Sequence, residues 1–81
     1  MKANQAYRLI LRRGGRAPAL LADTGRVDHV EVVEIDSGEV VLFWDCPPQT
    51  ASRLARALRE DLARLQDREL LERYESMHVD G

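Results

Sequence analysis

The chain has 81 residues, of which 44% are hydrophobic and 32% charged, with a formal net charge of −2. This composition is that of a globular domain rather than a disordered segment. A domain of this length buries only about 60–65% of its unfolded surface, so it usually needs a disulfide, a metal or a partner subunit. Cys46 is the single cysteine, and the two histidines make no zinc-like spacing with it. We therefore expect no cofactor, and a partner chain as the stabilising element.

The N-terminal residues predict no secretion signal. Lys2 and four arginines among the first sixteen residues interrupt any apolar run. The longest apolar run, Val40 to Trp44, is too short to span a membrane. A lone thiol in such a chain is typical of a reducing compartment. We expect a cytoplasmic protein with no membrane partner.

Charge is distributed unevenly along the chain. Residues 1–26 carry six cations and one anion, whereas residues 27–50 carry six anions and no cation. Opposite charges on two segments could set the register in which two chains pair.

The first expected element is a strand over residues 7–12, where apolar and charged residues alternate. Gly14-Gly15 should end it. Residues 17–22 form a short apolar piece, but Pro18 removes a backbone donor, so we expect an edge strand or an irregular segment there. A turn at residues 23–25 follows.

A hairpin is predicted over residues 27–35 and 40–44, which are rich in β-branched residues. Ser37-Gly38 would form a two-residue turn in which glycine supplies a positive φ. In that register Ile35 faces Val40, and His29 faces Cys46. Both faces of the sheet are then substantially apolar, and one helix cannot cover both of them.

A helix should begin at Pro47-Pro48, with Asp45 or Cys46 as its N-cap. Its apolar stripe has the spacing of three and four residues that marks an amphipathic helix. The stripe consists of Ala51, Leu54, Ala55, Leu58, Leu62 and Leu65. Eighteen helical residues span ~27 Å and seven strand residues ~23 Å, so the helix can lie along the sheet.

The apolar stripe loses its phase at Leu70, Leu71 and Tyr74. Either the helix breaks near Gln66-Asp67, and a second short helix capped by Asp67 follows, or one helix continues. Residues 77–81 should fray.

These elements predict a single α+β domain over residues 1–81. A sheet of three, or four, antiparallel strands over about residues 5–45 is followed by one long helix over about residues 48–75, packed on one face, with a short second helix as the alternative. Strand-strand-strand-helix is too common an order to indicate a family.

The one catalytic pattern in the sequence is Cys46 with His29. Cross-strand Cβ atoms lie ~5 Å apart, so the imidazole could lower the thiol pKa, with Asp28 or Asp45 orienting it. A single buried cysteine is more often a small hydrophobic residue, and no oxyanion donor accompanies this one. We expect a structural Cys46 and no catalytic residues.

The acidic residues between positions 31 and 45 do not converge, so they predict no metal site.

The arginines carry a second hypothesis. Arg53 and Arg56 lie near the start of the predicted helix, where cations oppose the helix dipole. With Arg8 and Arg12 they could bind phosphate groups of nucleic acid or of a ligand. The negative net charge favours a solvated surface instead.

The sequence therefore favours a non-enzymatic interaction module with an accessory or regulatory role. It would bind itself, as a homodimer, or another protein in a larger assembly. Nucleic-acid or phosphate binding is the alternative, and a cysteine-dependent enzyme comes third. The expected interface residues are Val30, Val32, Val41, Phe43, Leu70, Leu71 and Tyr74.

Overall fold

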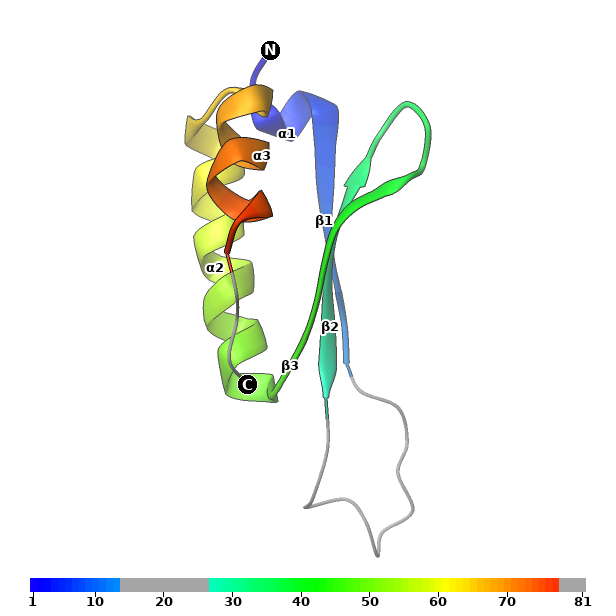
Figure 1. Cartoon of the computed structure of the whole chain (residues 1–81), viewed down its shortest axis with the longest axis vertical. Coiled ribbons are helices and arrows are strands. Elements are labelled where there is room, and N and C mark those ends of the chain that lie inside the picture. The colour runs from blue at the N-terminus through cyan, green and yellow to red at the C-terminus, as the bar shows by residue number, and fades with distance from the viewer. Residues whose placement is uncertain (14–26, 78–81) are drawn as a thin grey trace, which may run out of the picture.

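The computed structural model describes residues 1–13 and 27–77 and shows a three-stranded antiparallel sheet with helices on one side (Figure 1). The elements are α1 Ala3–Ala6, β1 Tyr7–Arg12, β2 Asp28–Glu34, β3 Val40–Cys46, α2 Pro48–Arg64 and α3 Asp67–Glu75. The strands are arranged in the order β1-β2-β3, so β2 is central. The expected α+β class is confirmed. The strand end at Gly14-Gly15, the segment at 17–22 and the turn at 23–25 lie outside the described residues.

The β2–β3 hairpin forms, but with a longer turn than expected. The Glu34 amide donates to the Glu39 carbonyl oxygen at 2.8 Å, and the Gly38 amide donates to the Glu34 carbonyl oxygen at 2.8 Å. Four residues, Ile35 to Gly38, therefore make the turn. Gly38 has φ 77°, which its missing Cβ allows.

The longer turn and a bulge in β3 together change the strand register. His29 faces Asp45, Val32 faces Leu42, and the pairing shifts between Val32 and Val33. The predicted register was wrong by two residues beside the turn, where Val40 faces Val33 rather than Ile35. It was wrong by one residue farther along, where His29 faces Asp45 rather than Cys46. A shift of two residues keeps Val40 on the side of Val33, whereas the net slip of one after the bulge moves the side chains of residues 42–46 to the other face relative to β2.

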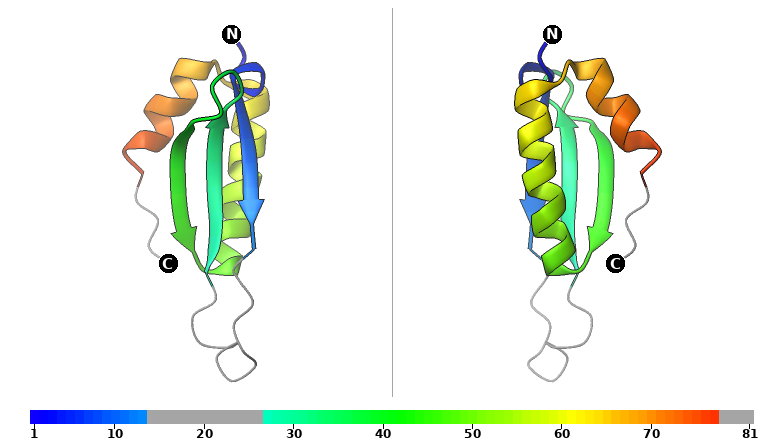
Figure 2. Two further views of the ribbon diagram at one scale, coloured as in Figure 1. Left: turned by 90° about the vertical axis from the view of Figure 1, so that its right-hand side faces the viewer. Right: turned by 90° about the vertical axis from the view of Figure 1, so that its left-hand side faces the viewer.

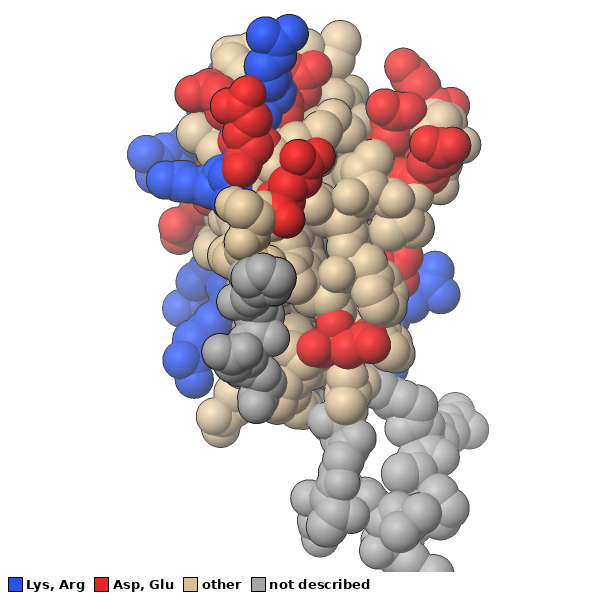
Figure 3. Space-filling view, viewed as in Figure 1, with Lys and Arg blue, Asp and Glu red and all other residues tan. Residues whose placement is uncertain are grey.

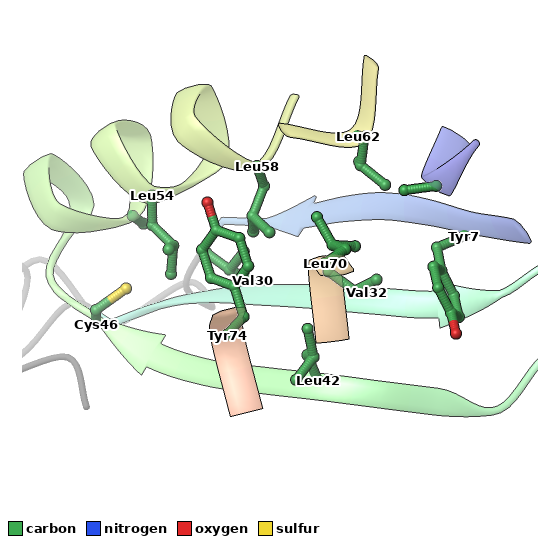
Figure 4. Packing of buried hydrophobic residues seen from close by; sticks show 12 residues of the cluster. Tyr7, Val30, Val32, Leu42, Cys46, Leu54, Leu58, Leu62, Leu70 and Tyr74 are labelled. Carbon is green, nitrogen blue, oxygen red and sulfur yellow. The ribbon is translucent and has the colours of Figure 1, made fainter. Parts of the chain in front are cut away.

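One face of the sheet forms the core together with α2. Val30 and Val32 of β2 are fully buried beneath the helix. Figure 4 shows the side chains of Leu54, Leu58 and Leu62 pointing from α2 toward the strands. Burying an aliphatic side chain of this size contributes about 1.5–3 kcal/mol, so this layer supplies most of the hydrophobic stabilisation.

The start of α2 carries no side-chain cap. The N-cap position is Pro47, and the Ala51 amide donates to the Pro47 carbonyl oxygen at 2.9 Å. The predicted caps Asp45 and Cys46 were wrong because β3 continues through Cys46 and holds both residues in the sheet.

The loss of phase in the apolar stripe marks a true helix break. α2 ends at Arg64, and α3 begins at Asp67 with a capping box between Gln66 and Glu69. The Gln66 amide donates to Glu69 Oε1 at 3.1 Å. The short second helix is thus confirmed in place of one continuous helix, but its N-cap is Gln66 rather than Asp67.

α3 packs beside α2 through a buried polar contact. The Tyr74 hydroxyl donates to Asp61 Oδ2 at 2.5 Å, and Arg73 lies 3.2 Å from the same oxygen. Leu70 is fully buried, and the ring of Trp44 meets that of Tyr74 edge-on. These contacts fix the C-terminal helix against the sheet.

The short helix α1 was not expected from the sequence. It ties the N-terminus to the α2–α3 junction, because the Ala3 amide donates to the Leu65 carbonyl oxygen and the Asp67 amide to that of Met1, both at 2.9 Å. None of the helices in the described part of the chain is long and apolar enough to cross a membrane.

Candidate interaction surface

The second face of the sheet is not covered by any helix or strand of the described residues. Figure 2 shows this side turned toward the viewer in its left panel, with α2 behind the strands. Alternation along the strands and the observed register define its members. This open face consists of Arg8, Ile10 and Arg12 of β1, His29, Glu31 and Val33 of β2, and Val40, Phe43 and Asp45 of β3.

Apolar side chains on the open face are exposed to an unusual degree. Phe43 is 51% exposed and Val40 50% exposed. Ile10 and Val33, in the neighbouring strands, are half-buried. The sequence analysis did not include Ile10, Val33 or Val40 among the expected surface residues. The position of Ile10 between Arg8 and Arg12, two residues from each, had placed it on the polar side of β1.

Polar and charged side chains on the open face pair with one another. Arg12 Nε lies 3.0 Å from Glu31 Oε2, and the Arg12 side chain is 64% exposed whereas that of Glu31 is 11% exposed. His29 Nδ1 hydrogen-bonds Asp45 Oδ1, and its ring stacks on Phe43 at 5.6 Å between centroids. The exposed cations thus lie along β1, and the exposed carboxylate of Asp45 lies on β3.

Four of the seven expected interface residues belong to the chain's own core. Val30 and Val32 are fully buried under α2, and Leu70 and Tyr74 are buried between α3 and the sheet. Their predicted exposure was wrong. Val30 and Val32 had been grouped with Phe43 through the incorrect register, and the helix break turns Leu70 and Tyr74 inward.

The other three expected interface residues lie in different places. Phe43 is on the open face. Val41 and Leu71 are half-buried and pack against the core. Phe43 is therefore the one member of the expected set that stands more than half exposed.

The expected pairing of His29 with Cys46 does not form. His29 lies on the open face, and Cys46 lies on the covered face with 1% exposure, opposite Asp28. Burial raises the pKa of the Cys46 thiol, and the charges of Asp28 and Asp45 raise it further. A thiol held in its neutral form is a poor nucleophile. Across residues 1–13 and 27–77, no three His, Cys, Asp or Glu side chains gather closely enough to hold a metal ion.

The four arginines of the expected phosphate site are divided between two sides of the molecule. Arg8 and Arg12 lie on the open face, whereas Arg53 and Arg56 are exposed on α2, beyond the sheet. Figure 3 shows basic side chains along the α2 side and acidic ones around the β2–β3 turn. The structure does not bring these four arginines together.

A hollow of about 610 Å³ lies beside the edge of β3. It is lined by residues 41–45 of β3 and by Tyr74, Glu75 and Met77. The Tyr74 hydroxyl is turned away toward Asp61, and burial together with that hydrogen bond raises the Tyr74 pKa. The lining contains two carboxylates, those of Asp45 and Glu75.

None of the family models, curated proteins or solved structures compared with the chain matches it. The open face, its charges and its exposed apolar residues are therefore the observations from which a function can be argued.

Proposed function

We propose that this protein is a non-enzymatic interaction module that self-associates through the open face of its sheet. The observation that carries the proposal is the exposure of Phe43 and Val40 on a face that no described element covers. Exposed apolar side chains gathered on one face, rimmed by charges, are typical of protein-binding surfaces. An accessory or regulatory role fits a small module of this kind.

The size of the open face indicates a weak dimer. Three strands spaced ~4.8 Å apart and about 20 Å long offer a flat area of roughly 300 Å² before side-chain relief is counted. Stable interfaces bury about 800 Å² on each partner. We therefore expect dissociation in the micromolar range rather than the nanomolar range.

Sedimentation velocity between about 1 and 200 µM tests the proposal, a range that brackets micromolar dissociation. The wild type should shift from monomer to dimer across it. Phe43→Glu should abolish the shift, because an unpaired charge in an apolar contact costs several kcal/mol. Ala63→Glu is the matched control, since it adds the same charge to an exposed position on α2, away from the open face. A wild type that stays monomeric throughout would refute the proposal.

A second candidate function rests on the outer side of α2. Four exposed arginines and a single exposed carboxylate lie on this helix: Arg53, Arg56, Arg59, Arg64 and Glu60. Cations along one helix can follow a phosphate backbone. If they do, affinity for a DNA or RNA oligonucleotide should fall with salt, and Arg53→Gln with Arg56→Gln should reduce the log-log slope by about two. A salt-independent or undetectable interaction would exclude this candidate.

A further inference from the structure

We infer that two copies pair face to face about a two-fold axis parallel to the strands, so that Arg12 of each copy faces Asp45 of the other. The inference rests on the proposed self-association and adds the arrangement of the partner. It follows from three features of the open face: where its charges lie, which rows the register forms, and how far its side chains reach.

The charges of the open face are separated across its width. Arg8 and Arg12 lie on β1, at one edge of the sheet, and Asp45 lies on β3, at the other edge. In the middle strand the Glu31 carboxylate lies 3.0 Å from Arg12 and its side chain is 11% exposed, whereas that of Arg12 is 64% exposed. A second copy therefore meets a cationic edge and an anionic edge, with the carboxylate between them largely covered.

Symmetry leaves two simple ways of stacking this face on itself. A two-fold axis across the strands places β1 over β1 and sets arginines against arginines. A two-fold axis along the strands places β1 over β3 of the second copy and sets arginine against carboxylate. Like charges that face one another cost several kcal/mol, so charge complementarity selects the axis along the strands.

The register places the opposing groups at the same height. Arg12, His29 and Asp45 form one row across the sheet, and Ile10, Glu31 and Phe43 form another. A two-fold axis along the strands places each row opposite the same row of the second copy. Arg12 then faces Asp45 of the second copy, and Ile10 packs against its Phe43.

The distance between packed sheets suits both contacts. Sheets stacked face to face lie ~10 Å apart, which an extended arginine and an aspartate can bridge together. Arg12 binds Glu31 through Nε, and its side chain remains 64% exposed. The Asp45 side chain is 54% exposed and meets His29 through Oδ1. Both groups therefore retain exposed surface for a partner.

Charge reversal in matched pairs tests the arrangement. Arg12→Asp and Asp45→Arg should each weaken the homodimer at least ~10-fold, because two like-charged pairs replace two opposite ones. An equimolar mixture of the two variants should form a heterodimer within about threefold of the wild-type affinity, since both pairs are again complementary. The Arg12→Asp/Asp45→Arg double variant should recover as a homodimer. Sedimentation equilibrium measures all four affinities.

The charge-reversal variants also lose the internal contacts with Glu31 and His29, so their folding is checked by thermal unfolding. Arg12→Gln and Asp45→Asn provide milder versions, each expected to weaken the dimer by roughly threefold and to reduce its sensitivity to salt. These neutral variants keep the test decisive if a reversed variant does not fold.

The outcomes separate the arrangement from the proposed function. A wild type that dimerises and is disrupted by Phe43→Glu, but is unaffected by Arg12→Asp, would overturn the arrangement alone. A stronger dimer of Arg12→Asp would indicate the axis across the strands and would also overturn it. A monomeric wild type would overturn both. Rescue in the mixed sample supports the arrangement.

Discussion

The two faces of the sheet are made by the same three strands but differ in burial. On the covered face, Val30 and Val32 are fully excluded from solvent beneath α2. On the open face, Phe43 and Val40 are half exposed, and the Arg12–Glu31 ion pair and the His29–Asp45 hydrogen bond link the strands beside them. Apolar residues are thus present on both sides, and it is the helix layer that determines which side becomes the core. The comparison indicates that folding stability resides on the covered face, and the open face is left for the self-association that we propose.

This division predicts very different costs for two large-to-small substitutions. Leu58→Ala should lower the free energy of unfolding by about 2–5 kcal/mol, because Leu58 is fully buried between α2 and the sheet. Phe43→Ala, its matched control, should cost under about 1 kcal/mol, since its ring is 51% exposed and loses chiefly the stack on His29.

Urea unfolding at about 1 µM, below the expected dissociation constant, measures both substitutions without a contribution from the dimer. Equal losses for Leu58→Ala and Phe43→Ala would mean that the open face is covered within the single chain.

The second prediction concerns the polar contact beneath α3. Tyr74→Phe should cost about 1–3 kcal/mol, because Asp61 is buried and loses the hydroxyl that donates to it at 2.5 Å. Arg73→Gln should cost less, since the Arg73 side chain is 59% exposed and its contact is screened by water.

Alkaline pH should weaken the same contact. Burial raises the Tyr74 pKa, so the folded state favours the neutral phenol. The stabilising contribution of the Tyr74–Asp61 contact is therefore complete below about pH 10, the pKa of tyrosine in the unfolded chain. It is lost as the pH rises toward the higher pKa that Tyr74 has in the folded state. Unfolding curves for the wild type and Tyr74→Phe should converge above about pH 10. A constant difference across that range would contradict the assignment.

Much of the fold follows from the sequence, whereas the surface depends on details that patterns do not contain. The strands at 7–12, 28–34 and 40–46 and the helix break near Gln66 all appear in the spacing of apolar residues. The face on which Phe43 lies depends on the one-residue bulge between Val40 and Leu42. The sequence Asp36-Ser37-Gly38 suits a two-residue or a four-residue loop, because Gly38 can adopt the positive φ that its position in either loop calls for.

The predicted candidate site was wrong because the sequence does not indicate the bulge. A shift of one residue placed His29 beside Cys46 instead of Asp45, and it joined Val32 to Phe43 instead of Leu42. Local propensity cannot choose between such registers, because the choice depends on which side chains α2 buries. The charged pair of Arg12 and Glu31 became visible only once β1 was placed beside β2.

The third prediction uses two neighbouring residues of β3 that lie on opposite faces. Cys46, with its buried thiol and raised pKa, should react slowly with a thiol reagent at pH 7, whereas Asp45→Cys in a Cys46→Ala background should react rapidly. The Cys46→Ala change itself should cost about 1 kcal/mol of stability, a typical value for a small buried side chain. Stopped-flow labelling of the two proteins provides the comparison, and equal rates would show that Cys46 is not shielded.

The smallest expected effect concerns the start of α2, where stability can be raised without touching the open face. α2 has no acidic residue in its first turn and no side-chain cap, whereas α3 has both Asp67 and Glu69 in its first turn and a capping box. The amide groups at a helix N-terminus carry partial positive charge, so Gln49→Glu, at an exposed first-turn position, should add about 0.3–1 kcal/mol at low salt.

Gln49→Lys is the control for this last prediction and should change the stability in the opposite direction. Both effects should shrink in 1 M salt, where the Debye length falls to about 3 Å. Because residue 49 lies on the helix layer, neither variant should alter the dimer dissociation constant measured by sedimentation. A change in dimer affinity that follows the change in stability would show that the two faces are energetically coupled, and the separation between folding and association would then fail.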